Sequence, residues 1–338
     1  MNHSTLIRHR EYGLDLLKVF ACLGVVAIHT LHVNKGLPNM VFAMSATVCI
    51  PIFLLVGGYL MLKRPGFNWR YALKKVLTIL LVCLCWETLH AAAHFVVYRE
   101  VRPFVQSWAL DFFQQGLFYH FWYMGALILV YLMMPLLDRL MQRSPAAYRN
   151  VLIGLGCFNA VTDLILTLTG NRILMSIPQS LRLHFWLFYT MLGGWIARNP
   201  EPVAKLRSRL KLWHVLMLLF AVVFYVRYVG LYAYGGADLE LFYGSAVVQL
   251  CGFVVFVFGQ GLKLSDRAGK RIVYLSSLTM GIYIMHPFVL AVLNKFIPAF
   301  TQGGAVMNLL FWIATTVICA ICIMVVQKIP VINRLLKL

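Results

Sequence analysis

About ten long hydrophobic stretches follow one another along the chain, and this ladder restricts the fold more than any other feature. Hydrophobic residues make up 61% of the 338 positions and charged residues only 12%. A soluble domain with that balance could not cover its surface with polar groups. Each stretch can cross about 30 Å of hydrocarbon as a helix, which takes about 20 residues. The sequence therefore predicts an all-α integral membrane protein.

The positions of these stretches predict a bundle of about ten transmembrane helices. The expected spans are 14–33, 41–62, 73–97, 118–138, 150–170, 183–198, 212–231, 242–262, 272–293 and 306–327. The segment 183–198 is the shortest, which fits a tilted or partly re-entrant element. Because no loop is long enough for a separate soluble domain, we expect a single membrane domain over residues 1–338.

Lys and Arg are distributed unequally between the two sides of this predicted bundle. With a cytoplasmic N-terminus and ten spans, 22 of the 30 basic residues fall on the inner side and seven on the outer side. Lys18 is the remaining one and lies within the first span. Basic residues accumulate in cytoplasmic loops, so the pattern predicts that both termini are cytoplasmic. It also accounts for the net charge of +19 without nucleic acid as a partner.

The eight cysteines all fall within predicted spans. Their spacings match neither a disulfide framework nor a set of zinc ligands, and we interpret them as small apolar thiols. No other group of residues supplies a convincing third metal ligand, so the sequence predicts no metal site.

Two ionisable residues, Lys18 and His29, share one face of the first span. They are eleven residues apart, which on an ideal helix is about 20° in direction and about 16 Å in height. Ionisable side chains at membrane depth are costly and are functional candidates by default. The alternative is that Lys18 extends to the inner headgroups and that His29 is a hydrogen-bonded core histidine. The shared face favours the functional reading of the pair.

Three further ionisable residues are expected at the depth of His29. Glu87, Asp163 and His286 lie in spans that run outward like the first one, and each is about 20 Å from its inner end. His120 begins an inward-running span and should lie at the outer rim. A layer of carboxylates and imidazoles suits general acid–base catalysis, and it equally suits a proton relay in a transporter. For the aromatic residues beside His120, an interfacial aromatic belt is the simpler explanation.

The second span contains residues that allow another helix or a substrate to approach closely, and a basic loop follows it. Pro51 frees a backbone carbonyl, and the pair Gly57–Gly58 allows another helix or a substrate to come near. The loop that follows contains Arg64 and Arg70. Basic residues are common in cytoplasmic loops of membrane proteins, so the loop needs no further explanation. It would also suit a donor that carries several phosphates.

Four motifs in order along the chain resemble those of the membrane-bound acyltransferase 3 family, the bacterial O-acetyltransferases of surface polysaccharides, antigens and periplasmic glucans. Members of that family have an Asp-x-x-Arg entry to the first span and a histidine eleven residues after the Arg. The corresponding residues here are Asp15-Leu-Leu-Lys18 with His29, Phe53-Leu-Leu-Val-Gly57-Gly58-Tyr59-Leu60, His120-Phe-Trp122-Tyr123 and Gly281-Ile-Tyr283-Ile-Met-His286. Lys18 replaces the usual Arg, which removes bidentate clamping, and Gly57 replaces a Ser and its hydroxyl.

The resemblance implies an O-acyltransferase of the bacterial inner membrane that moves an acetyl group from cytoplasmic acetyl-CoA to a carbohydrate or glycolipid. It implies that His29 is the general base or a transient acyl carrier, with Glu87 or Asp163 orienting it and with His120 and His286 nearby. Lys18, Tyr59, Arg64 and Arg70 would meet the donor.

Two other classes of function remain open at this point. A proton-coupled permease or lipid-linked sugar flippase would also use an ionisable layer, although the absence of an internal repeat disfavours it. A structural membrane subunit would not need His29.

Overall fold

The computed structural model describes residues 10–99, 104–115, 118–236 and 238–329, and this part of the chain contains helices and no strand. The longer helices are α1 (Tyr12–Thr30), α2 (Leu37–Ser45), α3 (Cys49–Leu62), α4 (Trp69–Tyr98), α6 (Trp122–Arg143), α7 (Pro145–Thr169), α8 (Leu183–Arg198), α10 (Leu212–Tyr234), α11 (Ala246–Gln260), α12 (Asp266–Phe296) and α14 (Ala305–Val326). The shorter ones are α5 (Phe104–Asp111), α9 (Pro200–Arg209), α13 (Ala299–Gln302) and the 3-10 helices η1 (Val33–Lys35), η2 (Ala46–Val48), η3 (Tyr119–Phe121), η4 (Ile173–Ser176), η5 (Gln179–Leu181) and η6 (Leu239–Leu241).

A helix occupies each of the ten predicted spans, and α8 reproduces 183–198 exactly as predicted. Within the described residues, seven helical segments are long and apolar enough to cross a membrane: 12–30, 37–62, 119–143, 145–169, 212–234, 266–296 and 305–326. Helices α8 and α11, with 16 and 15 residues, are shorter than a full span needs. The protein is thus an all-helical, multi-pass membrane protein. The count of ten spans stays a prediction, as does the side of the termini, whose residues 1–9 and 330–338 lie outside the described part.

Local sequence signals explain where several helices begin and end. The hydroxyls of Ser144, Ser245 and Ser265 each accept a hydrogen bond from the backbone N–H three residues later, at the starts of α7, α11 and α12. Pro145 follows Ser144 as the first helical residue, where its missing N–H costs nothing. Helix α7 ends at Gly170, whose φ of 64° is the left-handed conformation that glycine adopts most readily.

The closest helix contact joins α3 and α8 through glycines. A Cβ on Gly58 would lie 2.0 Å from the Thr190 carbonyl oxygen, and a Cβ on Gly193 would lie 2.2 Å from the Leu55 carbonyl oxygen. Only glycine permits this separation, since either Cβ would overlap backbone atoms. The sequence-based expectation that the glycine pair admits another helix is therefore confirmed for Gly58.

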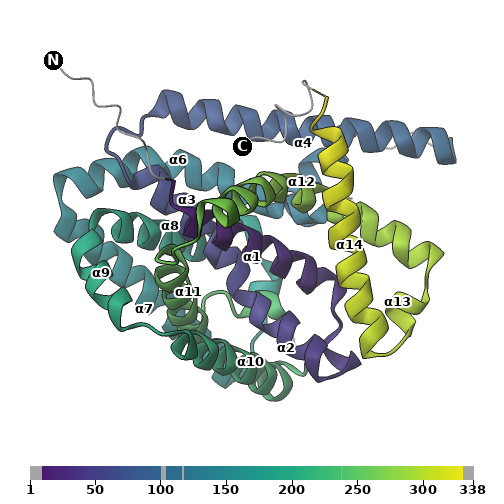
Figure 1. The fold of residues 1–338 in the computed structure, drawn as a ribbon. Coiled ribbons are helices and arrows are strands. Elements are labelled where there is room, and N and C mark those ends of the chain that lie inside the picture. The colour runs from purple at the N-terminus through teal and green to yellow at the C-terminus, as the bar shows by residue number, and fades with distance from the viewer. Residues whose placement is uncertain (1–9, 100–103, 116–117, 237, 330–338) are drawn as a thin grey trace.

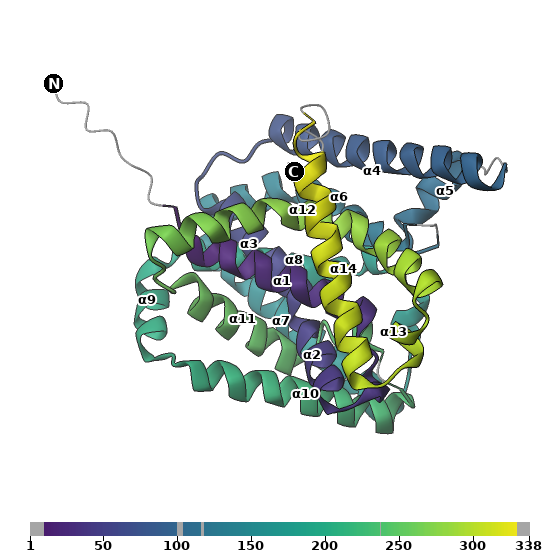
Figure 2. The ribbon, with the colours of Figure 1, turned by 45° about the vertical axis from the view of Figure 1, so that its right-hand side comes forward.

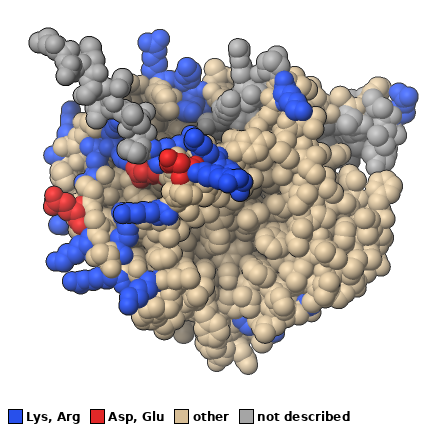
Figure 3. Space-filling view, viewed as in Figure 1, with Lys and Arg blue, Asp and Glu red and all other residues tan. Residues whose placement is uncertain are grey.

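Helix α1 lies in the middle of the bundle, where it packs most extensively against α12 and α3 and also against α11 and α14 (Figures 1 and 2). Helix α4 runs along one edge and packs on α6 and α5. Lys and Arg gather on the side of the molecule where α9 and the start of α1 lie, whereas the opposite part of the visible face is largely uncharged (Figure 3). The molecule thus has one basic side, and its assignment to the cytoplasm stays a prediction.

Candidate functional site

A cleft with a volume of about 800 Å³ runs between α1, α3, α4, α6 and α12. Four basic residues line one end of the cleft: Arg10, Lys18, Arg64 and Lys75. We call this the basic end. Tyr123 and Tyr283 line the cleft where it reaches furthest along α6 and α12. The cleft therefore joins the basic side of the protein to the aromatic interior of the bundle.

One face of α3 forms a wall of this cleft. Phe53, Gly57 and Leu60 line it, together with Val56 and Met61. These positions recur every three or four residues, so they share one helical face. A Cβ on Gly57 would meet only the Met61 side chain, at 3.4 Å, so the cleft wall at this position has room for a small side chain. Gly57 therefore faces the cleft, while Gly58 faces α8.

Two residues predicted to contact a donor lie outside the lining of this cleft. Tyr59 is two residues beyond Gly57, which turns it about 200° away around the helix axis. Its hydroxyl donates to Glu11 Oε2 at 3.0 Å and accepts from Gln260 Nε2 at 2.6 Å. Arg70 is exposed in the first turn of α4. The structure thus places Lys18 and Arg64 at the cleft and gives Tyr59 a place in a neighbouring polar network.

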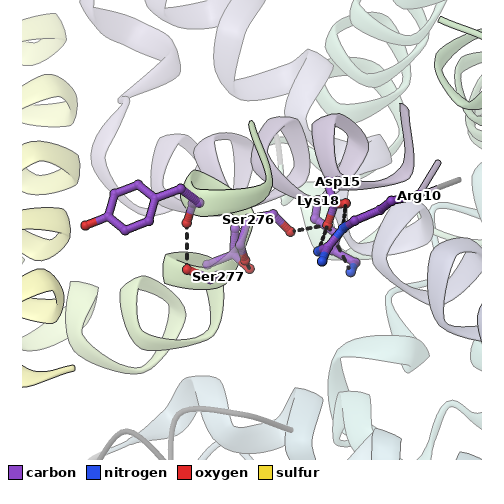
Figure 4. A network of polar contacts seen from close by, with 7 residues as sticks. Arg10, Asp15, Lys18, Ser276 and Ser277 are labelled. Atoms are coloured by element: carbon purple, nitrogen blue, oxygen red, sulfur yellow. Dashed lines mark hydrogen bonds and ion pairs between the residues drawn. The ribbon is translucent and has the colours of Figure 1, made fainter. Parts of the chain in front are cut away.

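The cations at the cleft mouth are held by a buried carboxylate (Figure 4). Asp15 is 3% exposed and accepts two hydrogen bonds from Arg10, at 2.7 and 3.0 Å. Lys18 Nζ lies 3.6 Å from Asp15 Oδ1, and the Ser276 hydroxyl donates to the same oxygen at 2.8 Å. Asp15 therefore joins α1 to α12 and fixes two cations that line the cleft.

Three histidines lie close together, with His29 near the end of α1, His286 within α12 and His120 in η3. The ring centre of His286 lies 5.1 Å from that of His29 and 5.4 Å from that of His120. Tyr119 Oη lies 3.4 Å from His29 Nδ1. Tyr283 lines the cleft, and its hydroxyl donates to the backbone carbonyl of His120. His29 and His286, which were predicted at one depth, are therefore neighbours, and His120, which was predicted at the outer rim, lies beside them just beyond the end of the cleft.

The backbone of α12 selects the tautomer of His286. Pro287 lacks the N–H that would otherwise bond to the carbonyl of Tyr283, four residues earlier. His286 Nδ1 lies 2.7 Å from that carbonyl oxygen. Since a carbonyl only accepts, Nδ1 carries the hydrogen and Nε2 keeps a free lone pair. His286 Nε2 is buried and has no hydrogen-bond partner among the described residues, so its lone pair is unused in the cluster.

The two carboxylates predicted at the same depth are engaged with other residues than His29. Asp163 on α7 accepts a hydrogen bond of 2.5 Å from the Tyr225 hydroxyl on α10. The carboxyl group of Glu87 on α4 faces that of Asp111, at the end of α5. Two residues at the same height on parallel helices are neighbours only if their helices pack against each other. Helices α7 and α4 pack chiefly on helices other than α1. The hydrogen-bond partner that the structure gives His29 is instead a tyrosine hydroxyl.

A second buried carboxylate, Asp138 on α6, shapes the mouth of the cleft. Its Oδ2 accepts from the backbone N–H groups of Gly66 and Phe67, at 2.8 and 2.9 Å. Arg198 Nη2 lies 3.5 Å from Asp138 Oδ1, and Arg198 Nε donates to the Leu62 carbonyl at 2.6 Å. Residues 64–68 line the cleft, so this pair positions the segment. Sequence reasoning missed Asp138, because nothing local marks a carboxylate that binds backbone some 70 positions away.

The described residues contain no group of three or more His, Cys, Asp or Glu side chains arranged to hold a metal ion.

Comparisons with known proteins identify the family. The acyltransferase domain family matches residues 11–327, nearly the whole chain. An amino-acid racemase of Enterococcus faecalis is 24% identical over 319 residues, which cover 86% of this chain and 43% of that protein. The chain thus spans less than half the length of that relative. No solved structure matches. The chain belongs to the acyltransferase domain family.

Proposed function

From this family membership and the geometry of the cleft, we propose that the protein is a membrane O-acetyltransferase. It moves an acetyl group from cytoplasmic acetyl-CoA to a hydroxyl of a cell-surface or lipid-linked carbohydrate, in the inner membrane of a bacterium. The observation that carries the proposal is the cleft itself, which has four cations at one end and leads toward three clustered histidines.

The dimensions of the cleft suit an acyl-CoA donor. Its phosphates would be met by Lys18, Arg64 and their basic neighbours, where charge attraction also raises the local donor concentration. The pantetheine arm is about 15–20 Å long, comparable to the height of about 16 Å between Lys18 and His29. The thioester would then reach the histidine cluster along a wall formed by α3 residues, several of them apolar, that restrict access of water to it.

The histidine cluster provides the acid–base chemistry that acyl transfer needs. In the proposed reaction His29 removes the proton from the acceptor hydroxyl, or carries the acyl group transiently, as the thiolate of CoA leaves. Tyr119 contacts His29 Nδ1, and His286 lies beside it with a free Nε2. His286 and His120 complete the cluster, and the acceptor would approach from the outer face.

The carboxylates take supporting roles in this scheme. Glu87 acts at a distance through Asp111 and the segment that carries Tyr119, and not by direct contact with His29. Asp163, hydrogen-bonded to Tyr225, would act on the cluster only through the packing of α7.

The test is the variant His29→Gln, with His32→Gln as the matched control because His32 lies just beyond α1 and is exposed. We expect His29→Gln to accumulate normally in the membrane, to bind acetyl-CoA and to leave the envelope glycan unacetylated, since glutamine cannot shuttle a proton. Mass spectrometry of the glycan and donor binding by the purified protein give the two readouts. If His29→Gln acetylates the glycan at the wild-type rate, the assignment of His29 is wrong and His286 or His120 becomes the candidate base.

A further inference from the structure

A buried pair of carboxyl groups lies next to the histidine cluster. Glu87 on α4 is 3% exposed, and Asp111 at the end of α5 is 0% exposed. The two carboxyl groups face each other within reach of a hydrogen bond. Glu87 Oε2 and Asp111 Oδ2 have no N–H or O–H donor from any other described residue. Two carboxylates that face each other in a buried site repel strongly, and a hydrogen bond between them requires one proton.

Asp111 connects this pair to the segment that carries the site residues. Its other oxygen, Oδ1, accepts from the backbone N–H of Phe118 at 2.7 Å. The next two residues are Tyr119, which contacts His29, and His120, whose ring lies 5.4 Å from that of His286. The pair therefore sets the start of η3 and, through it, two side chains of the cluster.

The surroundings of Asp111 favour a proton at neutral pH. Burial, and then the charge of Glu87, raise the pKa of Asp111 to about 7, although the Phe118 N–H acts in the opposite direction. The titratable groups facing Asp111 from α4 are Glu87 and the buried thiol of Cys83. The segment η3 contributes the Phe118 N–H and carries Tyr119 and His120.

We propose that Glu87 and Asp111 are positioning residues that share one proton, and that this proton holds the Tyr119–His120 segment beside His29 and His286. When the proton is lost to water, two carboxylates face each other, and α5 and η3 are pushed away from α4. The consequence for acetyl transfer rests on the proposed function, whereas the shared proton does not.

The first experiment detects the proton directly and needs no transfer activity. Infrared titration of the purified protein should show a protonated-carboxyl band at pH 6 that disappears by pH 9. Because each of Glu87→Gln and Asp111→Asn removes the need for a shared proton, both should lose this same band. Glu201→Gln, which changes an exposed carboxylate on α9, should keep it. A wild-type spectrum without a titrating band that Asp111→Asn removes would overturn the proposal.

The second experiment follows transfer against pH. If only the protonated pair supports transfer, the wild-type rate should fall about 50-fold between pH 7 and pH 9, as expected for loss of one proton with a pKa of about 7. Asp111→Asn keeps an oxygen for the Phe118 N–H and needs no proton, so its rate should stay level over that range. Superimposable profiles for wild type and Asp111→Asn would overturn the positioning role, even with the infrared band present. A titrating band without any transfer by the wild type would instead overturn only the proposed function.

Discussion

Replacing Asp138 tests whether a buried carboxylate far from the histidines controls the donor end of the cleft. The side chain is 1% exposed and accepts three hydrogen bonds of 2.8, 2.9 and 2.8 Å, from the N–H groups of Gly66 and Phe67 and from Gln142 Nε2. It also forms an ion pair with Arg198. Asp138→Ala removes all of these at once. It leaves two backbone donors without a partner, and the Arg198 guanidinium keeps only its hydrogen bond to the Leu62 carbonyl.

The expected cost follows from these contacts. Removing one partner of a buried ion pair costs about 3–5 kcal/mol. Asp138→Asn keeps one acceptor oxygen and loses the charge, so we expect about 1–2 kcal/mol for it. The freed segment 64–68 must be ordered again when a donor binds. If about 1.4 kcal/mol of the cost falls on that step, the Kd for acetyl-CoA rises tenfold.

The assay uses the protein's own thiols. Cys22, Cys49, Cys83, Cys251 and Cys319 are free and buried, so a thiol-reactive dye reports thermal unfolding in detergent. Asp138→Ala should unfold at a lower temperature than Asp138→Asn, and Asp138→Asn at a lower temperature than wild type. Asp266→Ala, at an exposed position in the first turn of α12, should behave as wild type. An unchanged Tm together with an unchanged acetyl-CoA affinity in Asp138→Ala would refute the reasoning.

Three shorter predictions address the rest of the basic side. A cysteine introduced at position 207 should react with thiol reagents only from the cytoplasm, and labelling from outside would contradict the ten-span topology. Lys18→Ala should weaken acetyl-CoA binding while Lys18→Arg keeps or improves it, and equal affinities would mean that Lys18 only reaches the headgroups. Burial favours the protonated form of Glu11, but hydrogen bonds from Lys63 and Gln260 outweigh it and lower the pKa of Glu11 below its ordinary 4.5. A lowered pKa stabilises the fold above the unfolded-state value, so Glu11→Gln should lower the Tm at pH 7. The difference from wild type should shrink as the pH falls below 4.5 and vanish below the lowered pKa of Glu11.

Hydrophobic length is a local property, and it predicted where the membrane helices lie. A run of apolar residues must form its hydrogen bonds internally in hydrocarbon, so each predicted span corresponds to a helix. Spacing along one helix was equally informative. Lys18 lies at the cleft and His29 in the histidine cluster, both on α1 as the eleven-residue spacing implied, and the motif order indicated the family that the match over residues 11–327 shows.

Only the tertiary structure decided which residues meet across helices. Depth predicted Glu87, Asp163 and His286 in one layer with His29, yet only His286 lies beside it. The rise per residue fixes height within a span, but the sideways neighbour of a residue depends on how helices pack, and one glycine contact such as Gly58 against the Thr190 carbonyl changes that packing. The partners of Asp138 and Asp111 could not be predicted either. Both carboxylates accept hydrogen bonds from backbone N–H groups, which every residue except proline has, so the sequence does not mark the partner.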